Sequence, residues 1–81
     1  MKIDYKPLEE HLRKIYFISL TGYVRTWLTR RVVGWYARPT GRMSLPFAAA
    51  KLGQEIEKAD LPLIVQEKSG KPYRLKILLK V

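Results

Sequence analysis

The sequence predicts a small α+β fold in a single domain, and three observations support this prediction. The chain has 81 residues, of which 47% are hydrophobic. This apolar content is enough for one hydrophobic core, but the chain is too short to form two domains with a core each. Two segments carry apolar residues at helical spacing, whereas the C-terminal end alternates between apolar and charged residues as a strand does. Because no repeat or linker interrupts the sequence, we expect residues 1–81 to form one unit.

The first predicted element is a helix over residues 7–16. Proline is tolerated in a first helical turn, and Leu8, Leu12 and Ile15 then follow at the i, i+4, i+7 spacing of one apolar stripe. Two glutamates near the start suit the positive end of the helix dipole, and each precedes a basic residue by four positions, which favours ion pairs.

The middle of the chain, residues 15–36, fits either a helix or strands. Its β-branched and aromatic residues favour strands, and Gly22 and Gly34 can end helices or form turns. A helical stripe is nevertheless more regular than the alternation, and its members are Leu20, Val24, Leu28, Val32 and Trp35. The sequence therefore leans towards a helix over residues 22–33.

A turn at Pro39-Thr40-Gly41 separates this segment from a second predicted helix. Ser44 before Pro46 is typical of a helix N-terminus, and the helix is expected from Phe47 to near Asp60. Its predicted inner face consists of Phe47, Ala48, Leu52, Ile56 and Ala59.

The last twenty residues predict a β-hairpin. The second strand is indicated by apolar residues that alternate strictly with cations. Its inner face is expected to consist of Tyr73, Leu75, Ile77, Leu79 and Val81. Residues 63–65 would form the partner strand, and residues 68–71 the connecting turn. Helices followed by a basic hairpin favour a winged-helix-like arrangement. The second possibility is an α-β-β-β-α core with an added hairpin, which is similar in order to double-stranded-RNA-binding domains.

The charge composition predicts a polyanionic partner. Sixteen Lys and Arg residues oppose seven Asp and Glu residues, giving a net charge of +9. No carboxylate occurs between His11 and Gln54, and every cation in residues 25–42 is arginine, whose planar fork binds phosphate. Arg38 and Arg42 flank the Pro/Gly turn, a shape that suits a minor groove. The C-terminal hairpin adds a cationic second patch that can contact backbone phosphates.

We therefore expect a non-enzymatic nucleic-acid-binding protein, with DNA favoured over RNA, that acts as a regulator or accessory factor. Of the two tryptophans, Trp27 is expected in the core, and Trp35 is expected beside Tyr36 in the binding site. The predicted binding residues are Arg25, Arg30, Arg31, Trp35, Tyr36, Arg38, Arg42, Lys68, Lys71, Arg74 and Lys76.

Other classes of function find less support. The absence of cysteine excludes a disulfide scaffold and thiolate zinc ligands, and a single histidine in a polar helical run does not predict catalysis, a metal or a cofactor. The rival hypothesis is a protein-interaction module or inhibitor that docks its basic face on an acidic or nucleic-acid-binding groove. Without a signal-peptide core, the chain is expected to be a cytoplasmic protein of a prokaryote, virus or mobile element.

Overall fold

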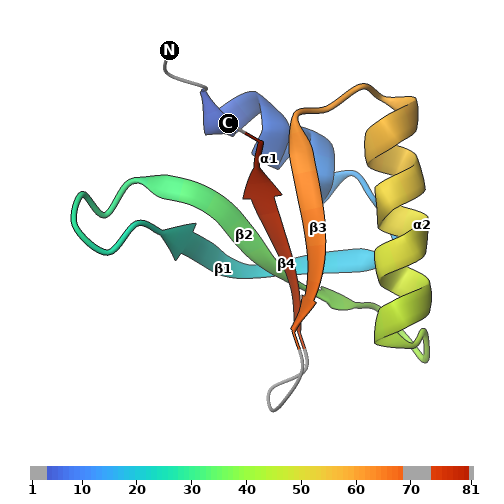
Figure 1. The fold of residues 1–81 in the computed structure, drawn as a ribbon. Helices are drawn as coiled ribbons and strands as arrows, with labels where there is room; N and C mark the ends of the chain where they lie inside the picture. The colour runs from blue at the N-terminus through green and yellow to red at the C-terminus, as the bar shows by residue number, and fades with distance from the viewer. Residues whose placement is uncertain (1–3, 69–73, 81) are drawn as a thin grey trace.

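The computed structural model describes residues 4–68 and 74–80 and shows two helices and four strands (Figure 1). In chain order these elements are α1 (Tyr5–Arg13), β1 (Ile18–Arg25), β2 (Val32–Pro39), α2 (Leu45–Lys58), β3 (Leu63–Lys68) and β4 (Arg74–Leu79). The fold is thus a small α+β domain, as the sequence predicts.

The strands form one antiparallel sheet in the order β1-β2-β4-β3. Because β2 and β3 are both antiparallel to β4, they run parallel to each other, with α2 as the crossover between them. Register shifts interrupt the β1–β2 ladder between Leu20 and Gly22 and again between Val24 and Arg25. Such irregularities increase twist, and the β1–β2 hairpin runs across the direction of β3 and β4 and projects away from α2 (Figure 1).

Helix α1 begins at Tyr5, two residues before the predicted start, because Asp4 caps it. The Asp4 carboxylate accepts a hydrogen bond from the Lys6 backbone N–H at 3.1 Å, which satisfies one of the free donors at the helix N-terminus. The helix ends at Arg13 rather than Tyr16. Its apolar stripe is confirmed by Leu8 and Leu12, which are buried in the core.

The predicted helix over residues 22–33 is wrong, since this segment contains parts of β1 and β2 and the turn between them. Strand β2 pairs with β4 and buries Trp35 and Ala37 against the helices with the two-residue period of a strand. Leu28, a member of the helical stripe, lies 84% exposed. The favoured winged-helix arrangement required this helix and is therefore also wrong, because residues 4–68 and 74–80 contain no helix-turn-helix pair. The α-β-β-β-α order also fails, because α2 follows two strands rather than three.

Helix α2 confirms the second predicted helix and begins two residues before Phe47. The Ser44 side chain accepts a hydrogen bond from the Phe47 backbone N–H at 3.4 Å, as expected for an N-cap. Ala48, Leu52 and Ile56 are buried as predicted, but Phe47 is 59% exposed and Ala59 is also exposed, so both were wrongly placed on the inner face. Ala48 of the same turn lies in the core and Leu45 packs against it, so Phe47 occupies the outward side of the helix.

Strands β3 and β4 confirm the C-terminal hairpin. Lys68, predicted as the first residue of the turn, belongs to β3, while residues 69–71, Tyr73 and Val81 lie outside the described residues. Leu75 and Ile77 are fully buried in the core, and Leu78, which breaks the apolar alternation, lies on the opposite face of the sheet. Gly34 permits the β2–β4 pairing, because a Cβ there would lie 2.1 Å from the Ile77 backbone oxygen. No helix in the described part of the chain is long and apolar enough to cross a membrane.

Candidate nucleic-acid interface

The two faces of the sheet differ in what covers them. Both helices pack on the inner face, where the core includes Leu12, Leu52, Trp35 and Ile77. The alternate residues of each strand lie on the opposite, outer face. None of them belongs to the core cluster under the helices, although Val24 on this face is only 9% exposed. The outer face is therefore the open face of the sheet, on which a ligand can lie.

Four residues of the predicted site meet on this open face, and we call them the sheet-face cluster: Tyr36, Arg38, Arg74 and Lys76. Tyr36 and Lys76 are directly paired across β2 and β4, and Arg38 follows Tyr36 by two residues on the same strand. The Arg74 guanidinium lies over the Tyr36 ring, 4.2 Å from its centroid. The predicted Arg-rich segment and the predicted basic hairpin thus supply one continuous surface.

The Tyr36 ring restrains the Arg74 side chain. Packing against the ring limits the positions open to the guanidinium and so favours one placement of its forked N–H groups before any ligand arrives. Its Nε atom is buried and has no hydrogen-bond partner among the described residues.

Charge is separated between the two layers of the fold. Within the described residues, the helices and their ends carry the carboxylates Asp4, Glu9, Glu10, Glu55, Glu57 and Asp60. Glu67, in β3, is paired with the buried Leu75 and so occupies an inner-face position of the backbone. The described positions of the open face therefore carry cations without a carboxylate, which gives that face a positive potential.

The tip of the β1–β2 hairpin forms a second cationic group, the hairpin-tip cluster, which consists of Arg25, Trp27, Leu28, Arg30 and Arg31. Backbone hydrogen bonds close the turn, from Thr26 N–H to the Arg31 carbonyl at 2.9 Å and from Arg30 N–H to the Thr26 carbonyl at 3.0 Å. The Arg25 guanidinium donates to the Arg30 carbonyl at 3.1 Å. Arg25 therefore helps to hold the turn, while Arg30 and Arg31 are exposed.

The two tryptophans occupy the reverse of their predicted positions. Trp35 is 1% exposed at the centre of the core and is removed from the binding site, whereas Trp27 is 91% exposed at the hairpin tip. Residues 26–29 carry no glycine or proline to indicate a turn, and the left-handed position is occupied by Arg30, with φ 55°. Sequence reasoning missed Trp27 because the turn had no compositional signal.

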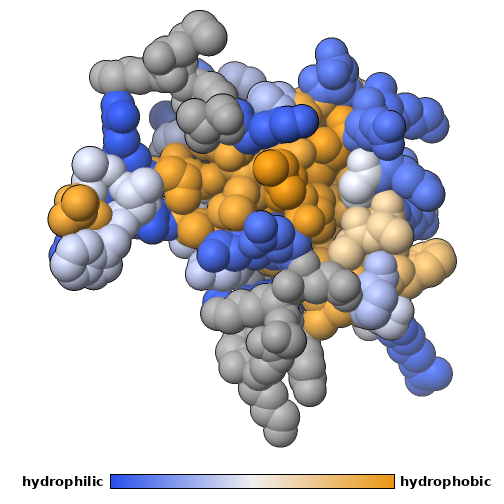
Figure 2. Space-filling view, in the orientation of Figure 1, coloured by the Kyte–Doolittle hydropathy of each residue, from blue (hydrophilic) through white to orange (hydrophobic). Residues whose placement is uncertain are grey.

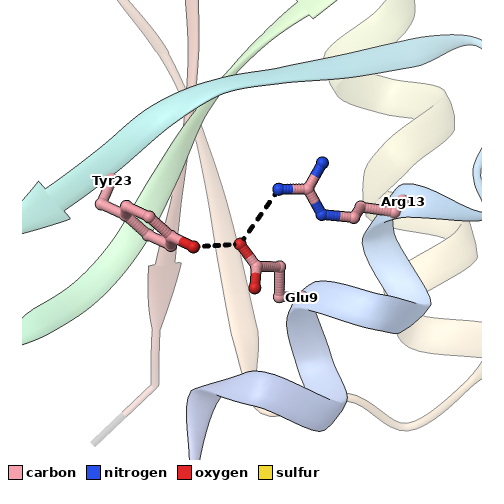
Figure 3. A network of polar contacts seen from close by, with 3 residues as sticks. All are labelled: Glu9, Arg13 and Tyr23. Atoms are coloured by element: carbon pink, nitrogen blue, oxygen red, sulfur yellow. Dashed lines mark hydrogen bonds and ion pairs between the residues drawn. The ribbon is translucent and has the colours of Figure 1, made fainter.

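A polar network fastens the base of this hairpin to α1 (Figure 3). The Tyr23 hydroxyl donates to the Glu9 carboxylate at 2.5 Å, and Arg13 contacts the same carboxylate at 3.3 Å. The Tyr23 hydrogen bond, with a smaller contribution from Arg13, lowers the pKa of Glu9, and the same bond raises the pKa of Tyr23. Arg25 lies over the Tyr23 ring at 5.4 Å, so the network also reaches the first arginine of the tip.

The remaining predicted residues are not brought into either cluster. Arg42 is exposed in the turn between β2 and α2, where Gly41 has a φ of 69°, at the opposite end of β2 from the hairpin tip. The Lys68 backbone pairs with Arg74 at the end of β3, but its side chain lies outside the described part of the structure. Lys71 lies entirely outside the described residues.

An apolar row crosses the open face beside the sheet-face cluster. Gly34 pairs with Val24 and Leu78, and Leu78 pairs with Ile64, which is 44% exposed. Figure 2 shows apolar side chains gathered over the middle of the molecule, around β3 and β4, with hydrophilic side chains around them. The open face is thus cationic at one end and apolar towards the hairpin tip.

The described residues contain no group of three or more His, Cys, Asp or Glu side chains that could hold a metal ion. Comparison with known proteins found no matching family, no matching curated protein and no matching solved structure.

Proposed function

We propose that this chain is a non-enzymatic nucleic-acid-binding protein that uses the open face of its sheet and the tip of its β1–β2 hairpin. The observation that supports this most strongly is the sheet-face cluster, where cations from β2 and β4 converge at positions without a described carboxylate. Cations presented in this way bind phosphates, and they release counterions from the nucleic acid as they do so.

The spacing of the two clusters suits an extended polyanion. Arg38 and the first residue of β2, Val32, are six residues apart, which corresponds to about 20 Å along a strand. This length equals about six nucleotides of rise along a duplex strand. A single duplex can therefore contact both clusters, with the apolar row between them.

The projecting hairpin favours DNA over RNA. The major groove of B-form DNA is about 12 Å wide and admits a two-stranded β-ribbon. The corresponding groove of an A-form RNA duplex is deep and narrow and does not admit side chains in the same way. Because the β1–β2 hairpin extends beyond the rest of the sheet, it has the shape that a DNA groove accepts (Figure 1).

A salt titration of binding tests the proposal. If about five phosphates are contacted, the logarithm of the association constant falls with the logarithm of salt concentration at a slope of about −4 to −5. The measurement uses a labelled DNA duplex and an RNA duplex of the same sequence. Tighter, salt-dependent binding to DNA is expected; a flat salt response or the absence of binding would refute the function.

A protein-interaction module is the second candidate, because the surface also exposes apolar side chains. Ile64 on the open face and Trp27 at the tip are of the types that anchor protein interfaces. A pull-down performed with and without nuclease separates the candidates. A partner that is retained after nuclease treatment favours the protein interface, and one that is released favours nucleic acid.

A further inference from the structure

The hairpin tip exposes two large apolar side chains that the fold does not use. Trp27 is 91% exposed and Leu28 is 84% exposed, and neither belongs to the hydrophobic core. They are the two most exposed large hydrophobic residues among those described. An adjacent Trp-Leu pair at the end of a projecting hairpin is therefore available to a ligand rather than to the core.

The backbone beneath this pair is closed by several hydrogen bonds. Thr26 and Thr29, which flank the pair, are joined through their hydroxyl groups, and the Arg31 N–H donates to the Thr26 hydroxyl at 3.2 Å. Together with the backbone bonds of the turn, these contacts fix Trp27 and Leu28 at the outermost point. A tip held in this way loses little conformational freedom when it inserts into a ligand.

The charges around the tip indicate what that ligand is. Arg25, Arg30 and Arg31 flank the apolar pair, and the hairpin from residue 18 to residue 39 contains no carboxylate. An apolar wedge surrounded by cations matches a base step, whose stacked bases are apolar and whose phosphates lie on either side. The hairpin tip differs in this respect from the sheet-face cluster, which presents cations with no exposed apolar pair among them.

We propose that Trp27 and Leu28 form a wedge that inserts between adjacent base pairs of DNA, while Arg30 and Arg31 bind the flanking phosphates. The inference rests on the proposed nucleic-acid-binding function and adds to it a deformation of the ligand. Insertion unstacks one base step and bends the duplex, and flexible pyrimidine–purine steps are the preferred sites.

The test uses a DNA duplex that contains 2-aminopurine at a TA step and carries a fluorescence donor and acceptor at its ends. The wild-type protein is expected to raise 2-aminopurine emission and to shorten the end-to-end distance. A Trp27→Ala/Leu28→Ala double variant is expected to abolish both signals, to lose about tenfold in affinity and to keep the salt-dependent slope. Phe47→Ala, which removes another exposed aromatic ring on the helix layer, serves as the matched control.

Each outcome decides the inference. If the double variant still unstacks and bends the duplex, the wedge is refuted while the DNA-binding function stands. If the wild-type protein fails to bind the duplex, the function itself is refuted. If the emission of Trp27 shifts to the blue on anionic phospholipid vesicles but is unaffected by DNA, the tip is a membrane anchor and the wedge is again refuted.

Discussion

The guanidinium of Arg74 lies 4.2 Å from the centre of the Tyr36 ring, and this contact joins the first residue of β4 to the middle of β2. It unites two basic segments that are far apart in the sequence. Lysine has no plane to stack and no fork for bidentate binding, so the contact depends on arginine.

The first prediction concerns this pair. Arg74→Lys keeps the charge but removes the fork, and we expect DNA affinity to fall by about fivefold, a loss of about 1 kcal/mol that is typical of one ordinary hydrogen bond. The slope of binding against salt should hardly change, because the number of cations is the same. Fluorescence anisotropy at several salt concentrations measures both, with Lys76→Arg as a control that should not weaken binding. An unaltered affinity for Arg74→Lys would show that the fork is not used.

The second prediction concerns the close approach of β2 and β4. Gly34→Ala places a Cβ where the Ile77 backbone oxygen lies 2.1 Å away, and the strands must separate to accommodate it. We expect the free energy of unfolding to fall by about 3 kcal/mol, as for severe overpacking. Gly22→Ala is the matched control, because no atom lies within 4 Å of its added Cβ. Urea unfolding measures both, and equal stability of the two variants would contradict the observed pairing.

The third prediction concerns α2. Leu52 is completely buried between α2 and the sheet, so Leu52→Ala should lower the free energy of unfolding by about 2–5 kcal/mol. Phe47→Ala, on the same helix but 59% exposed, should change stability by less than about 0.5 kcal/mol. Thermal or urea unfolding of the two variants measures both changes in the free energy of unfolding. A larger loss of stability for Phe47→Ala than for Leu52→Ala would contradict the inner face assigned to α2.

The fourth prediction concerns pH and the Glu9–Tyr23 hydrogen bond. The folded pKa of Glu9 is lowered, so its contribution to stability is present above the ordinary value of 4.5 and is lost as pH falls through the lower folded value. The folded pKa of Tyr23 is raised, so its contribution is present below 10 and is lost as pH rises through the higher folded value.

Tyr23→Phe removes the bond, and the wild type should therefore exceed this variant in stability by the same amount across neutral pH. The difference should shrink below pH 4.5 and again above pH 10. Urea midpoints of both proteins across the pH range provide the measurement. A difference that persists unchanged in strong acid would mean that the Tyr23 hydroxyl stabilises the protein in some way other than through its bond to the ionised Glu9 carboxylate.

Local chemistry was enough to predict both helices and the C-terminal hairpin. Ser44 with Pro46 marks the start of α2, and the alternation around Leu75 and Ile77 marks β4, because each signal acts within a few residues. Such local signals did not distinguish a helix from strands in the middle segment, residues 15–36. Its β structure depends on pairing with β4, a partner about forty residues later in the chain, and this tertiary pairing overrides a regular helical stripe.

The candidate site was predictable in part. The cations were identified from charge alone, but their grouping depends on the register of β2 and β4, which brings Tyr36 beside Lys76 and Arg74. The exchange of roles between Trp27 and Trp35 follows from the position of the turn, which leaves Trp27 between the two strands at the hairpin tip and Trp35 within β2 on its inner face.

The central claim, that the open face of the sheet binds DNA, can be tested by removing equal charge from the two layers. Each of two triple variants replaces three cations with glutamine, so both have the same net charge. The sheet-face variant changes Arg38, Arg74 and Lys76, and the helix-layer variant changes the exposed Lys6, Lys14 and Lys58. Urea unfolding first establishes that both variants fold.

Salt-dependent binding of both variants to the same DNA duplex is the measurement. The sheet-face variant should bind markedly more weakly, and its slope against salt should lose about three phosphate contacts, whereas the helix-layer variant should bind almost as the wild type does. Equal weakening of the two variants would mean that binding follows net charge alone, and it would contradict an interface on the open face of the sheet.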